Sequence, residues 1–215
     1  IKYAASTGKP LLISTGMANL KEISDAIEAA VSAGDGGAIL LHCVSGYPTP
    51  PEDANLRTME LLADAFHVPV GLSDHTLGTA VPIAAVTLGA TLIEKHVTMR
   101  RSDGGPDAGF SLEPHELRAM VDGCQTAFSA LGNTQFDRAA SEEANAQFRR
   151  SLYIVKDVAA GDVLDENVVR SIRPGFGLPP KWLPQILGCR AARDLTRGTP
   201  VDLSCVAWDG EDSPV

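Results

Sequence analysis

Two histidines in the middle of the chain have the types and positions that chemistry would need. His75 follows the apolar run at residues 68–72, and His96 follows the run at residues 90–93; both runs are typical of buried β-strands. Neutral imidazoles bind first-row divalent metals, and two of them leave coordination positions for substrate and water. The pair therefore predicts a divalent-metal site or an acid–base site. The alternative is one packed and one exposed histidine, which is the commoner fate of a histidine that stands alone.

Oxygen-bearing residues accompany both histidines. Side chains two apart share a face of a strand, so Ser73 should pair with His75 and Glu94 with His96. Glu94 could orient a ligand or act as a base. Asp74 should point away from His75, and we expect its carboxylate to hydrogen-bond the turn rather than reach a metal.

Three loops offer further candidates. Ser45 and Tyr47 follow the apolar run at residues 38–43, where Tyr47 could line a pocket or only pack on the proline-rich loop. Asp107 lies in the glycine-rich stretch GGPDAGF, as a site carboxylate or as an ordinary loop residue. Gly16 precedes a helix capped by Asn19, and that helix N-terminus could bind an anion or simply be capped.

Buried strands alternate with helices along the first 131 residues. The expected strands are residues 11–15, 38–43, 67–74 and 90–96, and the expected helices are residues 21–34, 57–66, 80–89 and 114–131. Short connections in this order predict parallel strands with right-handed crossovers. A doubly wound sheet and part of a (β/α)₈ barrel both fit, and both place active sites in the loops after the strands. The absence of GxGxxG after the first strand weakens a dinucleotide-binding interpretation.

The amino-acid composition changes after residue 131. Residues 132–148 are polar and irregular, which indicates a linker. Residues 149–206 alternate short β-like runs with Gly and Pro turns, which predicts a small β-rich domain, and residues 207–215 read as a frayed tail. Arg173 lies in the turn RPGFG, which could hold its guanidinium as a clamp on an anionic substrate or leave it solvated.

Composition excludes several classes of protein. The net charge of −9 argues against a nucleic-acid partner, and no apolar run approaches the roughly 20 residues of a membrane span. The first residues contain no signal-peptide hydrophobic region. The four cysteines have neither metal-ligand spacing nor the density of a secreted scaffold, so we expect reduced thiols and a cytoplasmic location.

Several stretches together resemble a known family. They are STGMANLKEI, LLHCVSGYPTPPEDANLR, GLSDHTLG, IEKHVT, SLYIVKDVAAGD and RPGFGL, and they cover almost the whole chain. In this order and spacing they resemble the nonulosonic acid (sialic acid-type) synthases. The resemblance implies an α/β fold: the C-terminal half of a (β/α)₈ TIM barrel over residues 1–131, then a small β-rich antifreeze-like (SAF, β-clip) domain over residues 149–206.

The resemblance also implies a reaction. Family members are transferases that condense phosphoenolpyruvate with an open-chain amino sugar, giving a nine-carbon 2-keto sugar acid and phosphate. GGPDAGFSLEP and RSIRPGFGLPP are most similar to the pseudaminic acid synthase branch, whose sugar is 2,4-diacetamido-2,4,6-trideoxy-L-altrose. The alternatives are an N-acetylneuraminate or legionaminic acid synthase, another metal-dependent aldolase on the same fold, and a non-catalytic carbohydrate-binding fragment.

Residue roles follow from the resemblance position by position. His75 and His96 match the ligands of a divalent metal, Mn²⁺ or Mg²⁺, while Glu94 and Asp107 match acidic residues of the catalytic site. The substrate-binding positions are Ser45, Tyr47, Ser73, Ala108 and Arg173. Arg173 matches an arginine that the antifreeze-like domain contributes to the partner subunit's site, which implies a domain-swapped homodimer.

The chain departs from the family pattern in one large respect. The first four βα units, which carry further substrate-binding residues, do not precede these four. We therefore expect the 215 residues by themselves to be inactive, or to be part of a longer protein, and we expect an open edge of apolar parallel strands to aggregate. Val97 and Gly46 differ from the usual family residues, and both should be tolerated.

Overall fold

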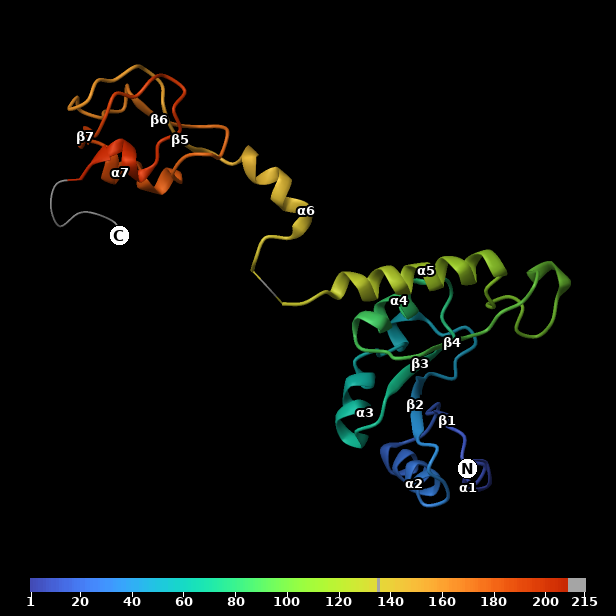
Figure 1. Cartoon of the computed structure of the whole chain (residues 1–215). Coiled ribbons are helices and arrows are strands. Elements are labelled where there is room, and N and C mark those ends of the chain that lie inside the picture. The colour runs from blue at the N-terminus through green and yellow to red at the C-terminus, as the bar shows by residue number, and fades with distance from the viewer. Residues whose placement is uncertain (135, 209–215) are drawn as a thin grey trace. The chain divides into compact units, whose positions relative to one another are not determined.

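The computed structural model describes residues 1–134 and 136–208, and the chain divides into two compact units, Ile1–Thr134 and Gln135–Val215 (Figure 1). The first unit contains a four-stranded parallel sheet. Its strands are β1 (Leu11–Ser14), β2 (Ala38–Cys43), β3 (Val70–Asp74) and β4 (Ile93–Lys95). Its helices are α1 (Lys2–Ala5), α2 (Leu20–Val31), α3 (Thr58–Phe66), α4 (Ala80–Thr87) and α5 (Pro114–Leu131), with 3₁₀ turns at η1 (Pro51–Asp53) and η2 (Arg101–Asp103).

Local sequence explains where these helices begin and end. The Asn19 side chain accepts a hydrogen bond from the Glu22 backbone N–H, and the Glu22 carboxylate accepts one from the Asn19 backbone N–H, which is the predicted capping box of α2. At the start of α5 the Glu116 carboxylate likewise accepts a hydrogen bond from the Glu113 backbone N–H. Helix α3 ends at His67, which adopts a left-handed conformation.

The strand order identifies the architecture. Neighbouring strands follow chain order, β1-β2-β3-β4, with no reversal, whereas a doubly wound sheet reverses at a switch point. The core packs α2, α3 and α4 against one face of the sheet; its buried members are Ile23, Leu40, Met59, Leu62, Val70, Leu72 and Ala85. In Figure 1 the four strands lie side by side, and α5 runs along α4. Sequential parallel strands with helices on one face form half of a (β/α)₈ barrel, which confirms the expected fold class.

Strand β1 differs from its expected burial. We expected a strand buried on both faces, but its residues alternate, and Leu12 is 50% exposed while Ile13 packs on the core. Among the described residues β1 pairs with β2 only, and only one of its faces meets helices. The prediction from its apolar sequence, burial on both faces, was therefore wrong for this chain.

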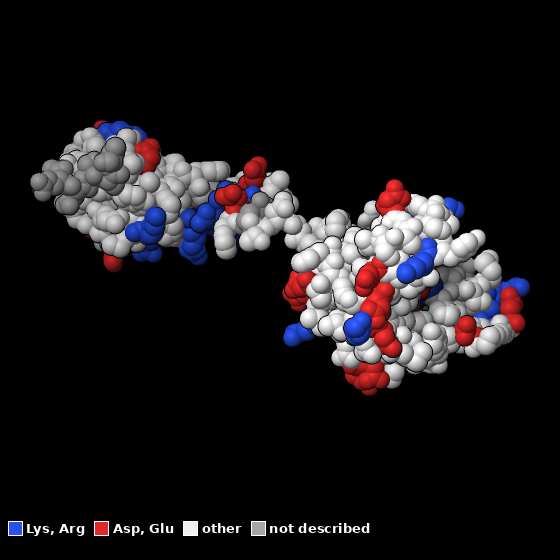
Figure 2. Space-filling view, turned by 90° about the horizontal axis from the view of Figure 1, so that it is seen from below, with Lys and Arg blue, Asp and Glu red and all other residues white. Residues whose placement is uncertain are grey.

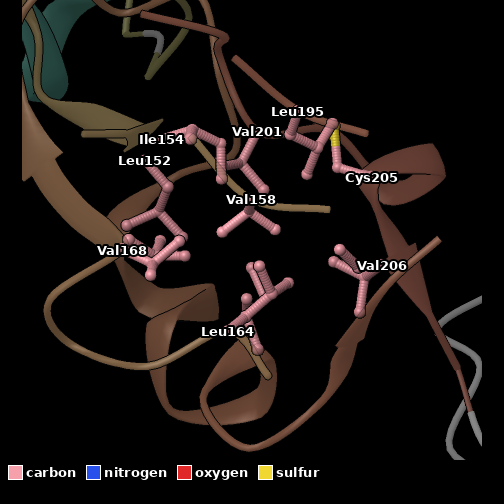
Figure 3. Close-up of a cluster of buried hydrophobic side chains, with 12 residues drawn as sticks. Leu152, Ile154, Val158, Leu164, Val168, Leu195, Val201, Cys205 and Val206 are labelled. Atoms are coloured by element: carbon pink, nitrogen blue, oxygen red, sulfur yellow. The ribbon is translucent and has the colours of Figure 1, made fainter. Parts of the chain in front are cut away.

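The second unit is built from short strands and turns. Its strands form two antiparallel pairs, β5 (Ser151–Ile154) with β6 (Val169–Ile172), and β7 (Arg190–Ala191) with β8 (Val206–Ala207). Its remaining elements are α6 (Ala140–Glu143), η3 (Ala144–Phe148), η4 (Pro180–Trp182), α7 (Leu183–Ile186) and η5 (Leu203–Cys205). Figure 3 shows its core, in which Leu152, Ile154, Leu164, Val201 and their neighbours point toward one another.

Two expectations about the segments around this unit were wrong. Within residues 132–148, expected to be irregular, α6 and η3 are helical, because alanines favour helix and Glu142 accepts a hydrogen bond from the Ala139 N–H. We predicted that the tail begins at residue 207, but residues 207 and 208 still belong to the folded unit. Ala207 pairs in β8, and Trp208 packs on the core and donates its indole N–H to Leu203 O; residues 209–215 lie outside the described part.

Two further observations concern the chain as a whole. No helix in the described ranges has both the length and the apolar character needed to cross a bilayer. Within those ranges Cys43, Cys124 and Cys205 are free thiols.

Candidate functional site

The two histidines meet at the carboxyl edge of the sheet. His75 directly follows β3 and His96 directly follows β4, and these strands are hydrogen-bonded neighbours. Their ring centroids are 5.2 Å apart, with the ring planes at 64°. Parallel pairing brings the two strand ends to the same edge, so residues 21 positions apart in sequence share one site.

His75 is held from behind by the backbone. Its Nδ1 lies 2.9 Å from the Val44 carbonyl oxygen, and its own carbonyl accepts a hydrogen bond from the Thr49 N–H at 2.9 Å. A carbonyl can only accept, so Nδ1 carries the proton and Nε2 keeps a lone pair. Backbone support of this kind is the usual means of orienting a metal-ligating imidazole.

His96 faces a carboxylate. Its Nδ1 is 3.6 Å from Asp107 Oδ2, which is close enough for electrostatic attraction but beyond hydrogen-bond length. Asp107 comes from the loop between η2 and α5, where the Ser111 hydroxyl donates to its carbonyl oxygen at 2.7 Å. The structure therefore brings Asp107 to the same site as the two histidines.

The two imidazoles can be compared with what a divalent ion would require. Within the described residues no group of three or more His, Cys, Asp or Glu side chains is close enough to enclose an ion. The chain provides two neighbouring imidazoles, and the orientation of His75 leaves its Nε2 available. These residues fit a divalent ion that takes its other ligands from water, substrate or further residues, which is the open arrangement of catalytic metal sites.

Ser73 and Glu94 meet across the strands. The buried Ser73 hydroxyl donates to Glu94 Oε1 at 2.7 Å, and the two residues are register partners in β3 and β4. This contact lies on the face of the sheet away from the helices, because Leu72 and Ile93 face the helical core. We expected Ser73 to pair with His75 and Glu94 with His96, but the hydrogen bond that forms joins Ser73 to Glu94 on the neighbouring strand.

An aromatic cluster surrounds the histidines. The Tyr47 ring lies 4.3 Å from the His75 ring and 5.8 Å from that of Phe110, and Phe110 lies 5.0 Å from His96. Phe110 was missed as a site residue from sequence. The available signal was a single large apolar residue in an otherwise small and polar loop, three positions after Asp107.

Ser45 lies against the loop after β1, whereas Ala108 is buried in the turn that carries Asp107. A methyl group at Gly16 would come within 2.4 Å of Ser45 Oγ and 3.1 Å of Cys43 Sγ. The first and second βα loops therefore touch at Gly16, where a larger residue would force the Ser45 side chain to move.

This contact yields a first prediction. Gly16→Ala should lower the free energy of unfolding by about 1–2 kcal/mol because the methyl displaces the Ser45 hydroxyl. Adding Ser45→Ala should recover most of that loss, since it removes the colliding oxygen. Urea unfolding of the four proteins of this cycle measures the coupling; strictly additive losses would show that the two loops do not touch.

The helix N-terminus after Gly16 is capped by its own side chains. The reciprocal Asn19–Glu22 bonds occupy two backbone N–H groups, and Glu22 places a carboxylate there. The structure supports ordinary capping over an anion site at this position.

Asp74 bonds the turn, as expected. Its carboxylate accepts from the Thr76 N–H at 3.0 Å and from the Thr76 hydroxyl at 3.1 Å. Sequence reasoning missed its second partner, Lys95, whose ammonium lies 2.5 Å away.

Arg101 anchors the loop that carries Asp107. Its side chain donates to Ser111 O at 3.0 Å and pairs with Glu116, and its backbone N–H donates to Glu113 Oε1 at 2.9 Å. The Glu113 N–H, which donates to Glu116 Oε2, lowers the pKa of Glu116, and Arg101 lowers it further. Glu116 is therefore ionised in its anchoring role at neutral pH.

A pH dependence follows for this anchor. Because folding lowers the pKa of Glu116, the stability it contributes is present above its ordinary value of 4.5 and is lost as the pH falls through its folded value. The stability difference between wild type and Glu116→Gln should thus be largest near neutral pH and shrink below pH 4.5. Urea unfolding across this range checks it; a difference independent of pH would contradict the assignment.

Arg173 lies in the second unit, exposed, directly after β6. The arrangement that joins Tyr47, His75, His96 and Asp107 belongs to the first unit. The assignment of Arg173 to a substrate site stays a prediction.

Each of the two units matches a known protein family or domain. The NeuB family profile matches residues 1–136, and the SAF domain profile matches residues 149–207. A pseudaminic acid synthase of Helicobacter pylori is 40% identical over 94% of this chain and 59% of its own length. An N,N'-diacetyllegionaminic acid synthase of Legionella pneumophila is 39% identical over 93% of this chain and 57% of its own length.

A solved structure supports the same relationship. The N-acetylneuraminic acid (sialic acid) synthetase of Leptospira borgpetersenii, crystallised with citrate, aligns with a TM-score of 0.61 and 36% identity over 69% of this chain and 52% of that one. This chain therefore spans somewhat more than half the length of the relatives that it matches. Profile, relatives and fold agree: the chain belongs to the NeuB family, with an SAF domain following its half-barrel.

Proposed function

We propose that this chain forms part of a pseudaminic acid synthase. The reaction would join C3 of phosphoenolpyruvate to the aldehyde carbon of 2,4-diacetamido-2,4,6-trideoxy-L-altrose, with water supplying the new C2 oxygen and phosphate leaving. The observation that carries the proposal is the paired imidazoles of His75 and His96 at neighbouring strand ends, with Asp107 beside them. The 40% identity to the Helicobacter synthase favours this branch.

The site residues divide into three roles under this proposal. A divalent ion, held by His75 and His96, would supply Lewis-acid polarisation of the sugar aldehyde. Glu94, oriented by the Ser73 hydroxyl, and Asp107 would exchange protons with the sugar hydroxyls and the aldehyde oxygen. The exposed Tyr47 ring, which lies over His75, would form one wall of the sugar pocket.

The negative net charge of the first unit indicates that an anionic substrate needs additional positive charge from outside this unit. Residues 1–134 carry 15 acidic and 8 basic residues, and carboxylates are spread over this unit in Figure 2. Lys95, next to His96, is already paired with Asp74. We therefore propose that Arg173 of a second copy supplies positive charge to this site in a domain-swapped homodimer, alongside the metal.

The test is a phosphate-release assay on two proteins. One is the 215-residue chain, and the other is the same chain preceded by the N-terminal βα units of a full-length relative. With phosphoenolpyruvate, Mn²⁺ and the L-altro sugar, the extended protein should release phosphate, whereas the 215-residue chain should not. Absence of phosphate release from a folded extended protein, with every sugar tested, would overturn the proposed reaction.

A legionaminic acid synthase is the second candidate, because the Legionella relative is almost as similar, at 39% identity. The same assay separates the candidates when the L-altro sugar competes with the corresponding manno sugar and with N-acetylmannosamine. A higher kcat/KM for either competitor would reject the pseudaminate assignment and keep the family chemistry.

We also propose that the protein works in the cytoplasm. The four cysteines have neither metal-ligand spacing nor the density of a secreted disulfide scaffold, which supports a reducing compartment. Thiol labelling of the protein in intact cells and after lysis would test this location.

A further inference from the structure

A buried ion pair lies directly behind the two histidines. Asp74, the last residue of β3, and Lys95, the last residue of β4, are register partners in the sheet. Their side chains are each only 2% exposed, and Lys95 Nζ lies 2.5 Å from Asp74 Oδ2. The proposed chemistry uses neither residue.

The pair occupies the face of the sheet opposite the reactive groups. Side chains alternate along a strand, so Asp74 points to the other side from Ser73, and Lys95 points to the other side from Glu94. The Ser73–Glu94 hydrogen bond marks the open face, and Leu72, two positions before Asp74, lies in the helical core. The ion pair thus cannot reach a substrate on the open face and can act only through its neighbours.

Those neighbours are the segments that carry the histidines. Lys95 Nζ donates to Asp74 Oδ2 and also to the Thr76 carbonyl oxygen, both at 2.5 Å. Asp74 in turn accepts from the Thr76 N–H and hydroxyl. The residues on both sides of His75 are therefore tied to the residue immediately before His96.

Packing alone does not fix this segment. A cavity of about 10 Å³, the size of a single water molecule, borders Asp74, His75 and Thr76 on the side of His42 and Thr49. A His75 segment released from Lys95 would keep its bonds to Val44 and Thr49, but it borders a space into which it could shift. Burying two charges is also unfavourable for stability compared with a well-packed apolar pair, so a purely structural role gives little reason for an ion pair here.

We propose that Asp74 and Lys95 form a positioning pair that sets the separation of His75 and His96, and so the metal affinity of the site. The metal part of this inference rests on the proposed function; the geometric part does not. Support for metal-binding imidazoles from residues behind them commonly changes metal affinity by about 10–100-fold.

The deciding variant removes the link between strands without leaving a buried charge. Asp74→Asn with Lys95→Met keeps an amide oxygen that can accept from the Thr76 N–H, but it loses both bonds from the ammonium. The matched control makes the same two changes at a surface pair, Asp25→Asn with Lys21→Met. That pair has the same 2.5 Å separation, but its side chains are 55% and 79% exposed.

Two measurements separate positioning from stability. The first is the NOE between the ring protons of His75 and His96 without metal. The second is the Mn²⁺ concentration that half-broadens the ring signals of the two histidines. In the extended protein, the deciding variant should lose most of the NOE and need at least about tenfold more Mn²⁺, while the control matches wild type.

Each outcome decides a specific claim. An unchanged NOE and an unchanged Mn²⁺ midpoint in a folded deciding variant would overturn the positioning role. Wild type whose histidine signals do not respond to Mn²⁺ would reject the metal assignment of the proposed function, and the NOE would still decide the geometry. Thr76→Val, which removes only the hydroxyl bond to Asp74, provides a milder variant if the double change prevents folding. Its effects on the NOE and on the Mn²⁺ midpoint should be about two- to threefold smaller than those expected for the double variant.

Discussion

His96→Ala should weaken Mn²⁺ binding by at least about 100-fold and abolish metal-dependent phosphate release in the extended protein. The physical reason is that the first unit offers two imidazoles at this edge of the sheet, so losing one removes half of the ligands that this chain contributes. Loss of a direct ligand should exceed the effect of removing a residue that only supports one. Titration with Mn²⁺, followed by broadening of the His75 ring signals, measures the affinity.

His115→Ala is the matched control for this prediction. His115 lies in the first turn of α5, and its side chain is 75% exposed, so its loss should leave Mn²⁺ binding unchanged. His96→Gln is a useful second variant because it retains side-chain volume beside Phe110. Equal Mn²⁺ affinity in wild type, His96→Ala and His115→Ala would refute the ligand assignment.

Leu152→Ala should destabilise the second unit by about 2–5 kcal/mol and leave the first unit unchanged. Leu152 is 0% exposed within the cluster shown in Figure 3, so truncation leaves a cavity that short strands and turns cannot readily close. In a unit of this size the loss corresponds to a fall in Tm of at least about 10 °C. Calorimetry should show one transition shifted and the other unmoved.

The reciprocal and graded variants test the independence of the two cores. Leu40→Ala, in the core of the first unit, should shift only the other transition. Ile154→Val should cost about 0.5–1.5 kcal/mol in the second unit, and Val163→Ala, at an exposed position, should cost less. A shift of both transitions by Leu152→Ala would show that the two units unfold together.

Much of the first unit could be predicted because its signals are local. The run AILLHC predicted β2 to the residue, and the expected helix at residues 114–131 has the bounds of α5, which begins at Pro114. The capping box of α2 likewise depends on residues only three apart. In contrast, the burial of β1 depends on which elements cover its two faces, and a four-residue apolar run contains no such information.

The candidate site shows the same division. Residue type and position after apolar runs were enough to select His75, His96, Glu94 and Asp107 as possible partners in chemistry. Sequence did not indicate that Ser73 bonds Glu94 across the strands, because such pairs depend on sheet register. Phe110 was missed for a related reason: the path of the loop after η2 decides that its ring packs on His96.

By itself the sequence determined the order of elements, the half-barrel with its following small domain, and the two histidines around which the site is built. Only the tertiary structure decided which residues meet: Tyr47 with His75, Asp107 with His96, and Lys95 with Asp74 on the opposite face. Helix caps and buried runs arise from interactions between residues close in the chain, which their spacing reveals. A site at the carboxyl edge of a parallel sheet arises from strand register and loop path, which become fixed only when distant segments pack together.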